Sequence, residues 1–243
     1  MASDIIKKMK IILLILILII IIFSIKNIVL IKDLIISKEY RKIYKAVIAE
    51  EADIIARLES YIINEKNKYL LSKAYVLLMY VKLHSGLDVL DEIEKINYND
   101  IFLKNGKYNK KFVNLNSDMF IWTLASMPLL YKQGHLPPIQ VKIIDLEDRL
   151  NNHIEYKVFK ACNAMLSNNS DGYQFLYDLV NGDYASLDYD KKLIGATKRV
   201  ALAYLGSLKK ENNIEYADEL KYFSTTMIGR KLLTDLEIFE IYK

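Results

Sequence analysis

Glycine, proline and cysteine are all scarce in this sequence, which contains 8, 3 and 1 of them among 243 residues. The first glycine is Gly86 and the first proline is Pro128, so backbone chemistry alone breaks no helix in the first third of the chain. A single cysteine excludes an intramolecular disulfide framework. Cys162 shares an apolar helix face with Val158 and Met165, which favours a buried, inert thiol over a reactive one.

An excess of one charge is also missing from most of the chain. The net charge is +4, but the first 40 residues hold six lysines against three acidic residues, which leaves 28 basic and 27 acidic residues for the rest. Nucleic-acid binding draws on a basic stripe that neutralises several phosphates. We therefore expect no nucleic-acid partner.

Motifs for metal or nucleotide chemistry are absent as well. His84, His135 and His153 lie far apart in the sequence, and no His-Glu-x-x-His or Cys-x-x-Cys pair occurs. His84 is better explained as a residue that suits the C-terminal end of a helix. None of the glycines forms a phosphate-binding loop. We expect no metal and no cofactor.

One long hydrophobic run stands out near the start of the chain. From Ile11 to Ile25 only Ser24 is polar. Fifteen residues rise about 22 Å as a helix, which is short of the ~30 Å hydrocarbon core, but the apolar residues 28–31 continue the run. The pattern predicts a transmembrane helix over 11–31, preceded by a basic tail (1–10) whose lysines reach the headgroups.

Two alternatives compete with this retained signal anchor. Basic residues before a 13-residue apolar core also describe a cleaved signal peptide, but small residues at the cleavage positions and a lipobox cysteine are missing after Phe23. A buried soluble helix is the third interpretation. Lysines flank both ends of the run, and their density favours a cytoplasmic N-terminus, with the C-terminal domain outside a bacterial inner membrane.

After the anchor, helical periodicity continues to the C-terminus. We expect a juxtamembrane stalk over 32–65, with one helix over about 37–63, and a domain of helical hairpins over 66–243. The first hairpin pairs the apolar stripe of 70–81, ending at His84-Ser85-Gly86, with the stripe of 90–96. The later hairpins join 117–127 to 139–150, 154–165 to a helix capped by Asp171, and 193–208 to 216–223.

Three local signals set the expected ends of helices in this domain. Ser117-Asp118 caps the helix that follows a polar connection over 97–116. Pro128 must kink or end that helix, because proline lacks the backbone donor. Thr234-Asp235-Leu236-Glu237 fits a capping box and predicts the start of a last helix.

The hairpin spacing and one segment carry a family resemblance. The second helices begin 34 to about 50 residues apart, and residues 200–223 place Leu205-Gly206 in a first helix and a small residue and Phe223 in a second. This segment resembles a degenerate tetratricopeptide unit, although Lys209 stands where an aromatic is expected. The resemblance implies an all-α fold, a right-handed stack of antiparallel hairpins (an α-solenoid), and a groove that holds a peptide or partner protein.

The sequence thus favours a membrane-anchored protein–protein interaction module, such as a scaffold, chaperone-like protein or assembly factor. Its expected partners are the lipid bilayer and another protein, and the expected groove contacts are Trp122, Tyr131 and Tyr204, with the core as the favoured alternative place for Trp122. The alternative is an enzyme or enzyme relic that acts on envelope polymers through carboxylates. Glu59-Ser60 resembles the Glu-Ser of lytic transglycosylases, but their Gly-Leu-Met-Gln segment is missing. Glu59 and the pair Glu50-Glu51 therefore read as solvated.

Overall fold

The computed structural model describes residues 38–98, 103–104, 107–108, 113–145, 154–167, 170–181, 191–208 and 216–243. The expected basic tail and transmembrane helix (1–31) lie outside these residues. Within the part of the chain that the structure describes, none of the helices combines the length and the hydrophobicity needed to cross a bilayer. The residues from Ala46 onward form one compact unit, distinct from those before it.

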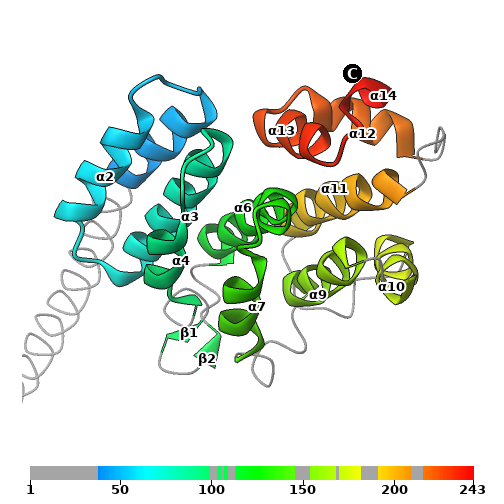
Figure 1. The fold of residues 1–243 in the computed structure, drawn as a ribbon, viewed down its shortest axis with the longest axis horizontal. Coiled ribbons are helices and arrows are strands. Elements are labelled where there is room, and N and C mark those ends of the chain that lie inside the picture. Colours follow the sequence, from blue (N-terminus) through cyan, green and yellow to red (C-terminus); the bar gives the residue numbers. More distant parts are fainter. Residues whose placement is uncertain are drawn as a thin grey trace, which may run out of the picture. The chain divides into compact units, whose positions relative to one another are not determined.

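The regular secondary structure of the described residues is helical apart from one pair of two-residue strands, which confirms the all-α class (Figure 1). The strands β1 (Leu103–Lys104) and β2 (Lys107–Tyr108) are antiparallel, with Leu103 opposite Tyr108. A further helix covers 38–48. The labelled helices are α2 (Ile54–Asn64), α3 (Lys68–His84), α4 (Leu90–Lys95), α6 (Val113–Lys132), α7 (Leu136–Ile144), α9 (Ile154–Leu166), α10 (Ser170–Asn181), α11 (Lys191–Leu208), α12 (Ala217–Ser224), α13 (Met227–Asp235) and α14 (Phe239–Tyr242).

Helix α6 lies at the centre of the compact unit, between α3 and α11 (Figure 1). It packs against α3, α9, α11 and α13. Its buried side chains include Phe120, Trp122, Leu124, Met127 and Leu130. In a solenoid each repeat contacts only its neighbours. Because α6 contacts helices from both ends of the unit, the right-handed stack stays a prediction.

Pro128 lies inside α6 and does not end it, because the helix continues to Lys132. Proline has no N–H, so the carbonyl four residues earlier, that of Leu124, loses its helical donor. The hydroxyl of Tyr204 on α11 donates to this carbonyl at 2.7 Å. A side chain from another helix therefore replaces the missing hydrogen bond, and α6 continues to Lys132.

The four predicted hairpins correspond to α3–α4, α6–α7, α9–α10 and α11–α12. The start of α6 is corrected: the helix begins at Val113 rather than at Ser117-Asp118, inside the segment expected to be a polar connection. Residues 146–150 of the expected α7 stripe lie outside the described residues.

The single helix expected over 37–63 is also corrected, because the chain turns at 49–53 between the helix of 38–48 and α2. Glu50 adopts the left-handed conformation, with φ of 53°. The N–H of Glu50 bonds to the carbonyl of Val47 and that of Glu51 to the carbonyl of Ala46, which is the hydrogen-bond pattern of a Schellman motif. Glycine usually occupies this position, so a glutamate there gives no stop signal in the sequence.

Glu237 repeats this arrangement at the end of α13, with φ of 65°. The N–H of Glu237 bonds to the carbonyl of Thr234, and that of Ile238 to the carbonyl of Leu233. Thr234 and Asp235 therefore close a helix instead of opening one, and the predicted capping box is wrong. The cap that forms is Thr226, whose side chain accepts from the N–H of Gly229 at 3.0 Å.

Candidate functional site

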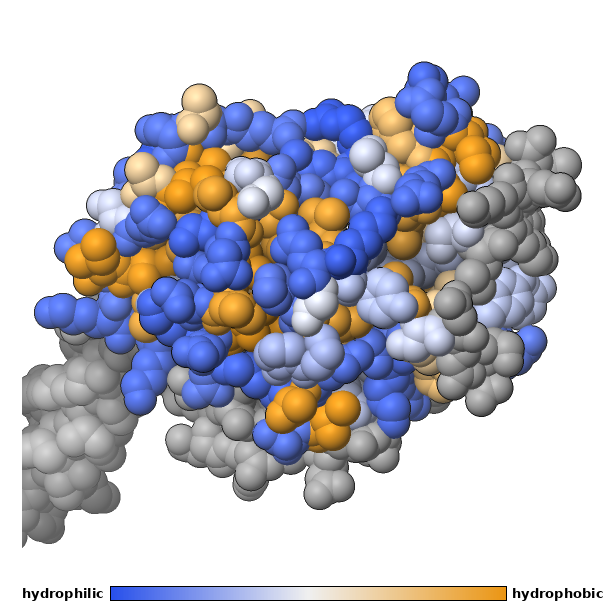
Figure 2. Space-filling view, in the orientation of Figure 1, coloured by the Kyte–Doolittle hydropathy of each residue, from blue (hydrophilic) through white to orange (hydrophobic). Residues whose placement is uncertain are grey.

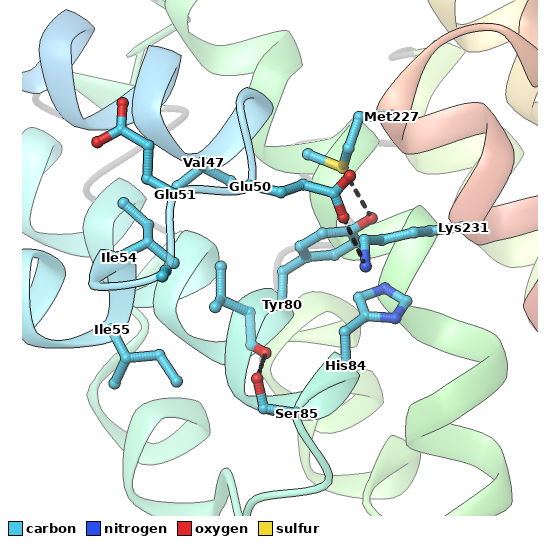
Figure 3. A pocket seen from close by; sticks show the side chains of 12 residues that line it. Val47, Glu50, Glu51, Ile54, Ile55, Tyr80, His84, Ser85, Met227 and Lys231 are labelled. Atoms are coloured by element: carbon cyan, nitrogen blue, oxygen red, sulfur yellow. Dashed lines mark hydrogen bonds and ion pairs between the residues drawn. The ribbon is translucent and has the colours of Figure 1, made fainter.

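A pocket of about 210 Å³ lies where the 49–53 turn, the last two turns of α3 and the start of α13 meet (Figure 3). One part of its wall is apolar and the other carries polar and charged side chains. The lining residues are Val47, Glu50, Glu51, Ala52, Ile54, Ile55, Tyr80, Val81, His84, Ser85, Met227 and Lys231. Apolar walls with a few convergent polar groups are typical of binding sites.

Glu50 extends from its turn toward α13, whereas Glu51 points away from it (Figure 3). The two oxygens of the Glu50 carboxylate contact different cations: Oε1 lies 3.0 Å from Lys231 Nζ, and Oε2 pairs with Arg230. The hydrogen bond from Lys231 and the charges of both cations hold the pKa of Glu50 below its usual value. Glu51 pairs with Arg57 instead. The pair expected to be solvated is thus exposed but ion-paired.

Tyr80 forms the floor of the pocket and is buried. Its ring packs edge-on against Trp122 and His84, with centroid distances of 4.6 and 4.4 Å. Its hydroxyl donates to the sulfur of Met227 at 3.7 Å, a weak acceptor. Burial raises the pKa of Tyr80 well above its usual value, so the hydroxyl stays protonated.

His84 and Asp235 form a second polar contact between α3 and α13. His84 Nε2 lies 3.6 Å from Asp235 Oδ2, and the side chains are only 12% and 10% exposed. Among the described residues, neither of these two atoms has a hydrogen-bond partner. Burial lowers the pKa of His84 to about 4, and Lys231 shifts it the same way. The histidine is therefore neutral at pH 7, and the contact is not an ion pair there.

Burial also raises the pKa of Asp235 to about 7, against the opposing charges of Lys132 and Lys231. Near neutral pH this carboxyl is consequently a mixture of the protonated and ionised forms. A carboxyl and an imidazole with shifted pKa values beside a pocket mark a candidate functional site. They give it groups that can accept or donate a proton near physiological pH.

The position of α13 depends on a close backbone approach at Gly229. The backbone is so close here that a Cβ atom at this position would overlap the carbonyl oxygen of Phe223. Thr226 anchors the same corner, because its hydroxyl donates to that carbonyl at 2.7 Å and accepts from Gly229. The start of α13, and with it Arg230 and Lys231, is therefore fixed against the end of α12.

The three residues expected to contact a partner lie in different environments. Trp122 and Tyr204 are each 1% exposed, so both side chains belong to the core, and Tyr204 serves the Leu124 carbonyl. Tyr131 is 47% exposed at the end of α6. None of the three lines the pocket. Only Tyr131 offers a surface to a partner in this arrangement.

The other candidates from the sequence also have defined places. Cys162 is fully buried, and burial raises the pKa of its thiol well above the usual value, in agreement with an inert thiol. Glu59 lies 3.4 Å from Lys82, which also binds the buried Glu92 at 2.8 Å. His135 Nε2 lies 3.6 Å from Asp88, and His153 lies outside the described residues. Over the described ranges, no three His, Cys, Asp or Glu side chains gather to hold a metal.

Comparison with known proteins adds no relative to this picture. No protein-family model matches the chain, and searches of curated proteins and of solved structures found no match either. The class that the structure defines is an all-α helical domain with a mixed polar and apolar pocket. Its function must therefore be argued from the residues.

Proposed function

We propose that this chain is a membrane-tethered protein–protein interaction module of a bacterial cell envelope. The tether is the run of isoleucine, leucine and phenylalanine over 11–23, and the observation that carries it is the absence of any polar residue there. Each Ile or Leu near the bilayer centre gains roughly 0.3–0.6 kcal/mol, so the twelve Ile and Leu residues of this run outweigh the lysines at the ends. Such a tether restricts the helical domain to partners near a bilayer surface.

The pocket supports binding rather than turnover. Its volume of about 210 Å³ is below the roughly 300–1,000 Å³ of drug-sized ligand sites, and suits a side chain or a chain end. A glycosidase needs two carboxyl groups that face each other across a cleft, about 5–9.5 Å apart. The two carboxylates that line this pocket, Glu50 and Glu51, follow one another on one turn and point apart (Figure 3). This arrangement favours the interaction module over the carboxylate enzyme.

Carbonate extraction of membranes from cells that express the full chain tests the tether. We expect the protein to stay in the membrane pellet, and a Leu16→Lys, Ile19→Lys variant to move to the supernatant, because each central lysine costs up to ~3 kcal/mol. A reporter fused after Lys243 reads the orientation, with an external signal expected. A wild-type chain that washes off with carbonate contradicts the proposal.

Crosslinking in intact cells tests the interaction. Crosslinking of the wild-type chain should recover the same partner protein reproducibly. The Leu16→Lys, Ile19→Lys variant, which no longer associates with the membrane, should not be crosslinked to that partner. Recovery of the partner by the soluble variant would show that the tether is dispensable. A purified chain that turned over an envelope polymer, with no partner in any crosslink, would favour the enzyme instead.

A further inference from the structure

We propose that Arg230 and Lys231 form a binding site for a carboxylate of the partner polypeptide, and that Glu50 occupies this site as an internal stand-in when no partner is bound. The inference rests on the proposed interaction function. It names the chemistry that the pocket recognises, namely an aspartate or glutamate side chain or a C-terminal carboxylate.

The first observation is how the Glu50 carboxylate is held. It receives one cation on each oxygen, and both cations come from consecutive positions of α13. This is the arrangement that a bound carboxylate ligand would show. The side chains of Glu50, Arg230 and Lys231 are 41%, 45% and 29% exposed, so water and an incoming chain can reach the ion pairs. Ion pairs this exposed are weak enough to exchange.

The second observation is the backbone cost of this placement. Glu50 has a φ of 53°, and non-glycine residues rarely adopt such an angle. Non-glycine residues in the left-handed conformation are concentrated at ligand sites and switch regions, where the surrounding structure holds the strained backbone in place. Here the backbone hydrogen bonds to Val47 and Ala46 close the turn, and the ion pairs to Arg230 and Lys231 hold the Glu50 side chain against α13. If a partner takes over these cations, the turn at 49–53 loses the contact that holds Glu50 against α13.

The third observation is the space beside the carboxylate. The pocket continues past Glu50 between Val47, Ile54 and Met227, which suits the methylene groups of an acidic side chain (Figure 3). Tyr80 offers a hydroxyl on the floor of the pocket, bonded only to the weak acceptor Met227 among the described residues. On the face seen in Figure 2, hydrophobic side chains alternate with hydrophilic ones. A charged anchor in a small pocket therefore gives a partner a more specific contact than that surface.

Glu237 provides an internal comparison. It adopts the same conformation, with φ of 65°, and its carboxylate lies 3.1 Å from Lys132. Its side chain is 70% exposed and does not line the pocket. Lys132 also donates to the backbone carbonyl of Asp235 at 2.9 Å, which closes the end of α13. Glu237 thus matches Glu50 in backbone conformation and charge but lies outside this pocket.

The test measures binding of a fluorescein-labelled peptide of alternating glutamate and glycine to the full chain in detergent, by fluorescence anisotropy. Glu50→Gly removes the stand-in and keeps the turn, because glycine adopts this φ without strain. We expect it to bind the peptide about tenfold tighter than wild type or more, since affinity scales with the fraction of open sites. Glu237→Gly should bind as wild type does. Adding Arg230→Gln and Lys231→Met to Glu50→Gly should abolish the gain.

Circular dichroism should show that both glycine variants are folded. If Glu50→Gly unfolds, Glu50→Gln replaces it, with the same expected gain in affinity. Its control is then Glu51→Gln, which leaves Arg230 and Lys231 unchanged. Equal affinity of wild type and the Glu50 variant overturns the inference. So does equal binding of a peptide with glutamine in place of glutamate. If phosphatidylglycerol vesicles gain affinity and the peptide does not, the site recognises lipid headgroups and the peptide proposal fails. A partner recovered by crosslinking whose capture is indifferent to Glu50→Gly leaves the interaction function standing and removes only this inference.

Discussion

The interface between α9 and α10 and the contact between α3 and α13 hold helices together in opposite ways. At α9–α10 the two backbones nearly touch: a Cβ on Gly172 would lie 2.7 Å from the carbonyl oxygen of Ala161. Buried apolar residues of these two helices include Val158, Phe159, Cys162, Met165 and Leu176. At α3–α13 the helices meet through long side chains, and a pocket remains between them.

Because of this difference, the packing of α9 on α10 should contribute mainly to stability, whereas the contact between α3 and α13 should respond to pH and to ligands. Close apolar packing is insensitive to pH and has no room for a ligand. Polar contacts such as His84–Asp235 and Glu50–Lys231 depend on protonation and on competing charges. Changes in conditions should therefore act first on the contact between α3 and α13, while α9–α10 responds mainly to changes of volume.

Gly172→Ala should produce the largest effect. The new methyl group would lie within 3 Å of the Ala161 carbonyl oxygen, the Ala164 Cβ and the Met165 nitrogen, two of which are backbone atoms that cannot rotate away. We expect a loss of about 3 kcal/mol or more in the free energy of unfolding, measured by urea denaturation, despite the gain in helix propensity. The matched control is Gly206→Ala, whose nearest neighbour is the flexible end of Leu220 at 3.2 Å. It should change stability by less than about 1 kcal/mol; equal losses at both glycines would remove the contrast between the regions.

The pH dependence of stability should depend on His84 and Asp235 in opposite directions. The pKa of Asp235 is about 7 in the folded chain against 3.8 ordinarily, so the folded state holds an extra proton in this window and stability falls as pH rises. The pKa of His84 is about 4 against 6.5, so the unfolded state holds the extra proton and stability rises with pH. Between about pH 4 and 6.5 the two contributions oppose each other.

Single substitutions separate the two contributions to the pH dependence of the free energy of unfolding. Asp235→Asn leaves the histidine contribution, so its stability should rise relative to wild type between pH 4 and 6.5. His84→Gln leaves the aspartate contribution and should fall between pH 4 and 7. Each change should be on the order of 2–3 kcal/mol in urea titrations across the window. If the free energy of unfolding of all three proteins depended on pH in the same way, neither pKa would be shifted by burial. The charged groups near the two side chains, Lys231, Glu50 and Lys132, are the same in all three proteins.

Tyr204→Phe tests the helix that lies between the two regions. Without the hydroxyl, the buried Leu124 carbonyl has neither a helical donor, because of Pro128, nor a side-chain donor. We expect a loss of about 1–3 kcal/mol in the free energy of unfolding. In a Pro128→Ala background the new N–H can bond to Leu124, so the same substitution should cost roughly half as much or less. A double-mutant cycle measures this, and additive losses would contradict the account of Pro128.

Tyr80→Phe should have the smallest effect. The hydroxyl contacts only the sulfur of Met227 among the described residues, at 3.7 Å, while the ring contacts with Trp122 and His84 remain in phenylalanine. We expect the free energy of unfolding to change by less than about 0.5 kcal/mol. A loss above about 1.5 kcal/mol would mean that this hydroxyl makes a stronger hydrogen bond than the one to Met227.

The sequence predicts helix ends well only where glycine marks them. Gly86 and Gly134 close α3 and α6 with φ of 70° and 76°, and the end of α3 at Gly86 agrees with the prediction from the sequence. Glu50 and Glu237 form the same turn without a glycine, and each makes an ion pair with a cation on another helix beside the backbone hydrogen bonds that close the turn. Those cations lie on other helices, so local patterns carried no sign of either turn.

The pocket was missed for a related reason. Tyr80 and His84 lie at ordinary positions of an apolar helix, and Met227 and Lys231 are more than 140 residues further along the chain. Trp122 and Tyr204 are predicted contacts because they are large aromatic residues, but a large aromatic side chain is as often buried in the core as it is used for binding. No periodic pattern distinguishes a histidine beside a distant aspartate from a helix-terminal histidine. This contact depends on tertiary packing alone.

The burial of Cys162 makes the molecule a convenient object for kinetic work. Cys162 is the chain's single thiol and a fully buried residue of α9, so it can react with an aromatic disulfide reagent only when its surroundings open. The labelling rate under native conditions consequently measures the equilibrium between closed and open forms. Labelling of Cys162 can therefore report local opening of the structure without an engineered label.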